Sequence, residues 1–240
     1  MNLRDQNIKA HMPFLMANSM LVCIGHTIVD PLTTYVAWKI HLADSDNELR
    51  RIETGLPQDS IECSPSCYIT NNVYIMTFYG GVWAQDRSHI RYSQYRMTGL
   101  SLDSLSKARK VNDDPLRTGF DGPLYAARGV KEEAVIDRKS DGKVLIFNGR
   151  FETLNRLTFR ADAPHQILAT GLTTNMTFKT YLIDLELGVF REVMVDGKSV
   201  YKSSICGNRI AYTVGDGDED RRIEFGVPQI AITRDPITLE

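Results

Sequence analysis

The stretch from residue 80 to 89 concentrates side chains of the kinds that bind ligands. It carries Trp83, Arg87 and His89 between two segments that read as strands. An indole ring on a loop can anchor a sugar or a protein partner, because burying so large a ring contributes much of the free energy of a contact. The sequence therefore predicts Trp83, Arg87 and His89 as binding residues. The alternative is that Trp83 folds back and packs over a neighbouring strand.

The other candidates for chemistry have simpler structural explanations. His26 and Asp30 lie in one connection and could form an acid–base pair, but a loop His beside an Asp usually makes an ordinary surface hydrogen bond. Cys63 and Cys67 would share one face of a strand, yet no further Cys or His follows at the spacing of a zinc site. We therefore expect no metal and no cofactor, and interpret the cysteines as small buried residues.

Charge and hydropathy argue against two classes of partner. The chain has 240 residues and a net charge of −2, with scattered Lys and Arg, so we expect no nucleic acid partner. Its apolar stretch at 12–24 is interrupted by Pro13, Asn18 and Ser19, which fits neither a signal peptide nor a membrane span. We expect synthesis in the cytoplasm without a signal peptide, and no membrane partner.

Strand signals dominate the sequence. Aromatic and β-branched runs separated by turn residues predict strands, among them 35–42, 49–53, 73–80, 144–147, 181–185 and 190–195. Asp141-Gly142 predicts a type I′ hairpin turn, since glycine readily takes the positive φ that this turn needs. The acidic run at 215–220 lacks the ligand spacing of a calcium loop and is interpreted as a solvated hairpin turn. Only 104–111 has helical character, so little helix is expected.

Two stretches look like copies of one unit. Residues 64–68 lead through Asn71-Asn72 into 73–80, and residues 202–206 lead through Gly207-Asn208 into 209–215. Each reads as strand, tight turn and strand, followed by a third short strand at 90–93 or 222–225. A repeat of about 45–50 residues built from about four strands is the signature of a propeller blade. The sequence therefore predicts an all-β propeller in a single domain.

The predicted strands group into five blades, although four remain an alternative. The proposed blades are 14–56, 58–112, 121–172, 173–197 and 198–240, of which the fourth shows only two convincing strands. A propeller ring commonly closes when one terminus lends a strand to the other, which removes exposed strand edges. The segments 14–16 and 230–233 are the expected contributors to that closure.

The blade openings resemble those of five-bladed glycoside hydrolases of the arabinanase and xylosidase type. Ser64-Pro65-Ser66 followed by Asn71-Asn72-Val73-Tyr74 is similar to one opening, and residues 133–136 followed by Asp141-Gly142-Lys143 are similar to another. The resemblance covers two or three blades. It implies carboxylates at the axial ends of innermost strands, one serving as general acid and one as base.

By that resemblance, the carboxylates available near strand starts are Asp30, Glu62 and Glu133, with Glu132 beside the last. The chain departs from the family pattern at two places. A neutral Ser-Cys context follows Pro65, and Asn18-Ser19 occupies the place of a catalytic Asp in the first blade. With two of three carboxylates missing, there is no evident route to glycoside cleavage.

The sequence thus predicts a non-catalytic propeller that serves as a structural or interaction component of a larger assembly. Propeller loops present many side chains on a stiff frame, which suits protein partners. A virus or phage particle is one setting for such a component. The alternative is a glycoside hydrolase or a carbohydrate-binding protein, which would require Glu62 and Glu133 to converge in an open central channel.

Overall fold

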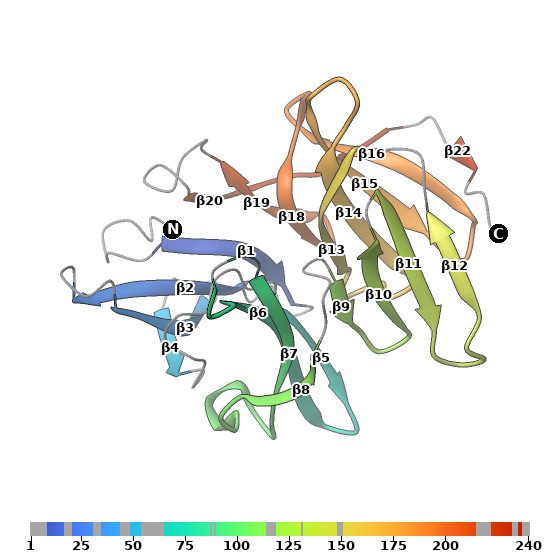
Figure 1. The fold of residues 1–240 in the computed structure, drawn as a ribbon. Coiled ribbons are helices and arrows are strands. Elements are labelled where there is room, and N and C mark those ends of the chain that lie inside the picture. Colours follow the sequence, from blue (N-terminus) through green and yellow to red (C-terminus); the bar gives the residue numbers. More distant parts are fainter. Residues whose placement is uncertain are drawn as a thin grey trace.

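The computed structural model describes residues 9–16, 21–30, 35–43, 49–53, 65–86, 88, 90–113, 119–130, 132–147, 151–214, 222–231 and 235–236. Within these ranges the chain forms five separate antiparallel sheets, and neighbouring strands follow one another in the sequence except where β21 and β22 pair with β16. Figure 1 shows the five sheets arranged in chain order around a common centre. The predicted all-β propeller in a single domain is confirmed.

The first two sheets are four-stranded meanders. One contains β1 (Lys9–Leu15), β2 (Leu21–Asp30), β3 (Tyr35–Ala43) and β4 (Leu49–Glu53). The other contains β5 (Ser66–Thr70), β6 (Val73–Trp83), β7 (Ile90–Gly99) and β8 (Arg109–Asp113). The helical signal at 104–111 was wrong, because the short 3₁₀ helix η2 covers Leu102–Ser104 and residues 109–111 already belong to β8. Ser101 and Ser104 cap the start of that helix reciprocally, since the Ser101 amide donates to Ser104 Oγ at 2.9 Å.

The third and fourth sheets divide the chain differently from the predicted blades. The third contains β9 (Gly119–Asp121), β10 (Tyr125–Val130), β11 (Glu133–Arg138) and β12 (Val144–Phe147). The fourth contains β13 (Thr153–Phe159), β14 (Gln166–Leu172), β15 (Phe178–Asp184), β16 (Val189–Val195) and β17 (Lys198–Ser199). The predicted boundary at 172/173 was wrong, because β14 pairs with β15 along its whole length. The blade that looked thin in the sequence is therefore the broadest sheet.

The fifth sheet has three strands, β18 (Tyr201–Cys206), β19 (Arg209–Val214) and β20 (Arg222–Gly226). Four of the five sheets of the described chain thus form complete blades of four or more strands. A count of five includes this three-stranded sheet as an incomplete blade.

The C-terminal segment covers an outer edge of the propeller. Strands β21 (Gln229–Ile230) and β22 (Asp235–Pro236) both pair with β16, and the Ala231 amide donates to the Glu192 carbonyl at 2.9 Å. In Figure 1, β22 lies beside the outer strands of the fourth sheet. The segment 230–233 was expected to close the ring by pairing with the blade at the other terminus. This is wrong for Ile230, which pairs with β16 of the fourth sheet. The segment instead satisfies the outward-facing backbone groups of β16, which would otherwise form an exposed edge.

Turn residues with positive φ fix the geometry of both copies of the repeated hairpin. Asn71 and Asn72 have φ of 48° and 61°, the left-handed pair that a two-residue type I′ turn requires, and Gly207 has φ of 58° at the same place in the second copy. Tyr68 pairs with Ile75 across the first turn, and Ser204 pairs with Ala211 across the second. Tyr68 and Ser204 therefore occupy equivalent positions, each three residues before its turn.

The predicted type I′ turn at Asp141-Gly142 was wrong in type. Gly142 has the expected positive φ of 69°, but the last strand pair before the turn is Asp137 with Val144, and the Arg138 amide donates to the Lys143 carbonyl at 2.9 Å. The connection is thus longer than two residues. Arg138 fixes it by donating to Asp141 Oδ1 at 2.9 Å and to Oδ2 at 2.6 Å.

Candidate functional site

The centre of the propeller is filled with aromatic rings. Phe159 of β13 lies with its ring 5.3 Å from that of Phe14 in β1, 5.3 Å from Phe120 in β9 and 6.3 Å from Tyr68 in β5, centroid to centroid. All four residues belong to the first strands of their sheets, and the three Phe side chains are at most 2% exposed. We call these four residues the aromatic hub. The hub occupies the position where the predicted hydrolase chemistry needs an open channel with facing carboxylates.

One carboxylate lies on a first strand beside the hub, and it is already paired. Asp121, at the end of β9, accepts from Arg96 Nη2 at 2.8 Å through Oδ2 and contacts Lys139 Nζ at 2.5 Å through Oδ1. Lys139 Nζ also lies 5.9 Å from the centre of the Tyr68 ring. Burial raises the pKa of Tyr68, and the negative charge of Asp121 raises it further. With a cation on each oxygen, Asp121 joins the second and third sheets.

The predicted catalytic residues do not lie in one described site. Asp30 ends β2, and its backbone pairs with Tyr35. Glu133 begins β11, the third strand of its sheet, and pairs with Val130 across a hairpin. Glu62 lies outside the described residues, so its predicted convergence with Glu133 stays a prediction.

The predicted binding residues are placed only in part. Trp83 is the last residue of β6 and pairs with Ile90, so it lies in a strand instead of at a loop tip. Its side chain, Arg87 and His89 lie outside the described part of the chain. The neighbouring turn is ordered by Asp86, whose Oδ1 accepts from the Ser88 amide at 3.0 Å and from the Ser88 hydroxyl at 2.7 Å.

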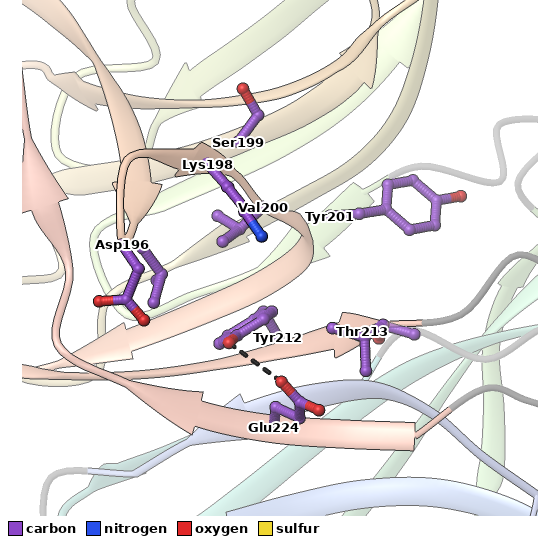
Figure 2. Close-up of a pocket in the computed structure, with 10 residues that line it drawn as sticks. Asp196, Lys198, Ser199, Val200, Tyr201, Tyr212, Thr213 and Glu224 are labelled. Carbon is purple, nitrogen blue, oxygen red and sulfur yellow. Dashed lines mark hydrogen bonds between the residues drawn. The ribbon is translucent and has the colours of Figure 1, made fainter.

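A groove of about 350 Å³ lies between the fourth and fifth sheets, away from the hub. One wall is the continuous segment from Val195 through the β17 hairpin to Tyr201, and the other is formed by β19 and β20 (Figure 2). Its lining residues are Val195, Asp196, Lys198, Ser199, Val200, Tyr201, Tyr212, Thr213, Val214 and Glu224. The groove residues are thus brought together where the two sheets meet. We take this groove as the candidate functional site.

Local structure explains how the groove wall turns. Asp196 and Gly197 have φ of 49° and 71°, the pair of left-handed residues that a type I′ turn needs between β16 and β17. The Gly197 amide donates to Gln229 Oε1 at 2.9 Å, so the C-terminal segment holds this hairpin in place. At Gly226 a Cβ would lie 2.8 Å from Val195 Cγ1, and the two sheets can approach this closely only because the side chain is absent.

Aromatic and ionic groups line the groove together. Tyr212 donates from its hydroxyl to Glu224 Oε2 at 3.2 Å, and Figure 2 shows this pair at one wall with the Lys198 side chain extending in from the opposite one. The Tyr201 ring lies 4.4 Å from the Phe178 ring, centroid to centroid, with the ring planes tilted by 48°, and Lys202 Nζ lies 5.1 Å from the centre of the Tyr201 ring. These contacts fix the orientation of Tyr201 at the rim. The Tyr212 ring and the charged side chains beside it can contact a small polar ligand in the groove.

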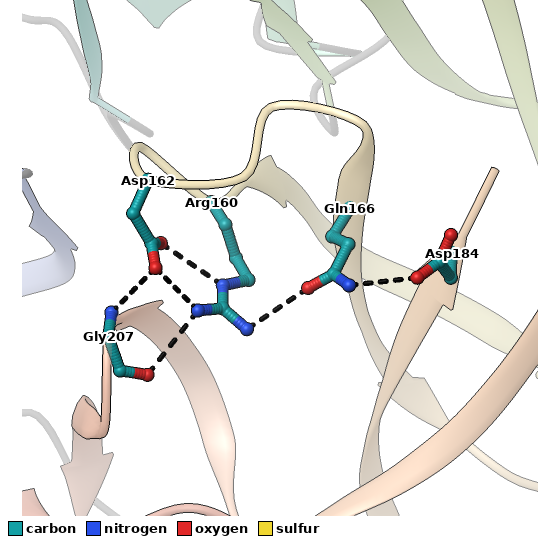
Figure 3. A network of polar contacts seen from close by, with 5 residues as sticks. All are labelled: Arg160, Asp162, Gln166, Asp184 and Gly207. Carbon is teal, nitrogen blue, oxygen red and sulfur yellow. Dashed lines mark hydrogen bonds and ion pairs between the residues drawn. The ribbon is translucent and has the colours of Figure 1, made fainter. Parts of the chain in front are cut away.

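A polar network joins the same two sheets at another point (Figure 3). Arg160 donates to both oxygens of Asp162, at 3.1 and 2.6 Å, and to Gln166 Oε1 at 3.0 Å. Asp162 Oδ2 also accepts from the Gly207 amide at 2.8 Å, and Gln166 continues the network to Asp184 Oδ2 at 2.8 Å. Partial burial opposes ionisation of Asp162, but the bonds from Arg160 and Gly207 outweigh it and lower the pKa. This network fixes the turn of the fifth sheet against the fourth.

A fully buried arginine completes the junction. Arg156 of β13 is 1% exposed and donates to the carbonyls of Pro13 at 2.7 Å and Lys202 at 3.1 Å, so it joins the first, fourth and fifth sheets. Burial lowers the pKa of Arg156 to about 9, and the guanidinium therefore stays protonated at neutral pH. Its two partners are carbonyl oxygens at strand positions, which suits a structural connection.

The groove residues were missed because the sequence shows them as ordinary strand and turn positions. Asp196-Gly197 is a recognisable turn, and Tyr212 sits in the second copy of the repeat, but nothing local indicates that Lys198 and Glu224 face one space.

The cysteine interpretation fits at Cys67, which is 1% exposed and whose pKa burial raises to about 12. Among the described residues, no cluster of His, Cys, Asp or Glu is arranged to hold a metal. Over the same residues, no helix has the length and apolar character needed to cross a membrane.

Comparisons with known proteins add little beyond this geometry. No family model matches the chain, and no curated protein matches it significantly. Among solved structures, the chain is similar to KlHsv2 with loop 6CD replaced by a Gly-Ser linker, at 7% sequence identity and a TM-score of 0.37. That match covers 95% of this chain and 99% of the other.

Proposed function

We propose that this chain is a non-catalytic propeller that serves as an interaction component of a larger assembly. The observation that carries the proposal is the aromatic hub. Catalysis of the hydrolase type needs two carboxylates about 5–10 Å apart with space for a sugar and a water between them. Phe14, Phe120 and Phe159 fill the centre instead, and Asp121 beside them is paired with two cations.

The periphery supports an interaction role. Several turns and strand ends carry large apolar side chains that are mostly exposed, among them Leu100 (77%), Met176 (70%), Val227 (64%) and Leu187 (61%). A partner that covers such side chains removes apolar surface from water, which would favour the complex. A virus or phage particle as the setting stays a prediction from the sequence.

Light scattering on untagged protein purified from its source tests the proposal. We expect a complex of fixed stoichiometry with a mass well above 27.1 kDa, and crosslinks to the partner from the turns that expose apolar side chains. Leu187→Ser, in the turn between β15 and β16, should weaken the complex if this turn contacts the partner. A monomer of 27.1 kDa at cellular concentration would overturn the proposal. Release of reducing sugar from arabinan or xylan by the purified monomer would favour the hydrolase alternative instead.

A further inference from the structure

We propose that the turns at one end of the second and third sheets bind an acidic patch on a protein partner. The proposal rests on the interaction role proposed above, and it names the surface and the chemistry that would serve that role. The turns are those between β5 and β6, β7 and β8, β9 and β10, and β11 and β12, and we call them the docking end. Each carries one exposed apolar side chain, namely Ile69 (53%), Leu100 (77%), Leu124 (45%) and Val144 (42%).

Strand pairing places the two turns of each sheet next to each other. In the second sheet, Tyr74 pairs with Ile69 on one side and with Gly99 on the other, so the connection after Gly99 begins beside the β5–β6 turn. In the third sheet, the Lys139 amide donates to the Leu124 carbonyl at 3.0 Å and joins the two turns directly. The four turns therefore form two adjacent pairs.

Side chains then join the two pairs of turns across neighbouring sheets of the ring (Figure 1). Arg96 Nη2 of the second sheet lies 2.8 Å from Asp121 Oδ2 of the third. Lys139 Nζ of the third sheet lies 5.9 Å from the centre of the Tyr68 ring of the second. The docking end is thus one continuous part of the surface, held in place by an ion pair and a cation–π contact.

The opposite end of the same two sheets has a different composition. In the turns between β6 and β7 and between β10 and β11, the exposed residues that the structure describes are Gln85, Asp86, Ser88 and Glu132, all of them polar. Exposed apolar side chains are common singly on protein surfaces, but their concentration at one end of a sheet pair is typical of a contact surface.

Cations outnumber carboxylates at the docking end. Over residues 99–109, 121–125 and 138–144 the cations are Lys107, Arg109, Arg138, Lys139 and Lys143, and the carboxylates are Asp103, Asp121 and Asp141. Asp121 is already paired with Arg96 and Lys139, and Asp141 with Arg138. Lys107, Arg109 and Lys143 are exposed and form no ion pair with a described residue. The surface therefore carries a positive excess, which an acidic partner complements.

The mixture of groups favours a protein over a uniformly anionic surface. Asp103 and the paired Asp121 and Asp141 lie among the cations, so a lipid headgroup layer or a nucleic acid backbone would bring phosphates close to carboxylates. A protein can place Asp or Glu opposite Lys107 and Lys143 and apolar side chains opposite those of the turns. Such a partner matches both the charge and the apolar contacts.

Hydrogen exchange followed by mass spectrometry tests the proposal on the complex purified from its source and on the free chain. We expect slower exchange in the complex at 68–74, 99–108, 122–125 and 139–144, and no change at 174–178. Because the contact includes exposed charges, raising sodium chloride from about 0.1 M to about 0.5 M should weaken the complex. Slower exchange only outside the four turns would overturn this proposal and leave the interaction role standing. A monomer without any partner would overturn both.

Other anionic surfaces are included in the same test. The free chain is mixed with phosphatidylserine vesicles and, separately, with duplex DNA. We expect neither to displace the protein partner. Displacement by either one would show that the docking end serves a lipid or a nucleic acid, and would overturn the proposal of a protein partner.

Variants locate the contact when they are recombined with the purified partner. The double variant Lys107→Glu, Lys143→Glu should weaken binding about 10-fold or more, and Leu100→Ser about 3- to 10-fold, while both keep the circular dichroism of the parent. The matched controls are Lys198→Glu and Met176→Ser, which change an exposed lysine and a similarly exposed apolar residue of the fourth sheet's turns. Both controls should bind as the parent does. If the docking-end variants bind as tightly as the controls, the partner contacts another surface and the assignment is wrong.

Discussion

The fourth sheet meets its two neighbours in different ways. Toward the third sheet and the centre, β13 presents Leu157 and Phe159 to a dry cluster of aromatic and aliphatic side chains. Toward the fifth sheet, the same strand presents Arg156, which donates to backbone carbonyls of two other sheets. Alternation of side chains along one strand thus produces an apolar junction and a polar junction, and the polar junction is also joined by a smaller apolar cluster that includes Leu182, Val193 and Ile210. Apolar contact has no preferred direction, whereas the hydrogen bonds of Arg156 fix how two sheets sit against each other.

This difference also explains where the groove lies. A close-packed aromatic hub leaves no space for a ligand, because buried rings fill the volume between their sheets. The polar junction combines that smaller apolar cluster with fixed points at Arg156 and at the Arg160 and Asp162 pair, and the space between the outer strands stays open as the groove. Removing a side chain at each junction therefore measures what each contributes.

The largest loss of stability is expected at the hub. Phe159→Ala should lower the free energy of unfolding by about 3–5 kcal/mol, because Phe159 is 1% exposed and contacts rings from three other sheets. Urea unfolding monitored by circular dichroism measures it. Phe159→Leu keeps much of the volume and should lose less. A loss below about 1 kcal/mol for the Ala variant would mean that the hub does not hold the sheets together.

Arg156→Ala is expected to have the next largest effect. It leaves the Pro13 and Lys202 carbonyls without their donor and creates a cavity, so we expect a loss of about 2–4 kcal/mol in the same urea measurement. Arg156→Met fills the cavity and removes a buried charge, and should lose less than the Ala variant. Equal losses for the two variants would show that the hydrogen bonds, and not the packing, account for the effect.

Much of this architecture could be predicted from local sequence. Alternating apolar residues and turn pairs such as Asn71-Asn72 fix hairpins at short range, so the strands and the repeated unit were found correctly. The division between the third and fourth sheets was missed, because the link between β12 and β13 carries no stronger turn signal than a hairpin does. Which hairpin joins which sheet depends on packing between distant segments.

The candidate site could not be predicted from local sequence patterns, for a related reason. The aromatic hub needs Phe14 and Phe159 to meet, and the groove needs Lys198 and Glu224 to face one space, although these residues are far apart in the chain. A strand pattern tells which side chains are buried, but it does not tell which sheets will be neighbours. The predicted carboxylates lie near strand starts, whereas Asp121, the described carboxylate on a first strand beside the hub, ends a strand only three residues long.

Asp162→Asn tests the second fixed point of the polar junction. It weakens the ion pair with Arg160 and the bond from the Gly207 amide, so we expect a loss of about 1–2 kcal/mol at pH 7. The pKa of Asp162 is lower in the folded protein than in the unfolded chain. Its contribution is therefore complete above the unfolded pKa and is lost as the pH falls through the folded value.

The pH dependence gives this prediction its control. Between about pH 5 and pH 2 the parent protein should lose more stability than the Asp162→Asn variant, because the variant has no carboxylate to protonate at that position. Asp196→Asn, at an exposed position in the turn between β16 and β17, serves as the matched substitution and should follow the parent curve. Parallel curves for all three proteins would show that the Asp162 network contributes nothing to acid stability.

The smallest effect is expected at Ser204, where the two copies of the repeat differ most. Tyr68 contributes a ring to the hub, but its equivalent Ser204 carries a small hydroxyl that accepts from the Leu15 amide at 3.0 Å. A ring at 204 would occupy the space that β1 fills, so the small side chain is what lets the first and fifth sheets meet.

Ser204→Ala should cost about 1 kcal/mol, because the Leu15 amide loses its acceptor, and should speed hydrogen exchange of that amide. Ser204→Thr retains the hydroxyl and should preserve slow exchange at Leu15. If exchange at Leu15 is equally slow in the Ala variant, then packing of β1 against the fifth sheet, and not this hydrogen bond, closes the ring.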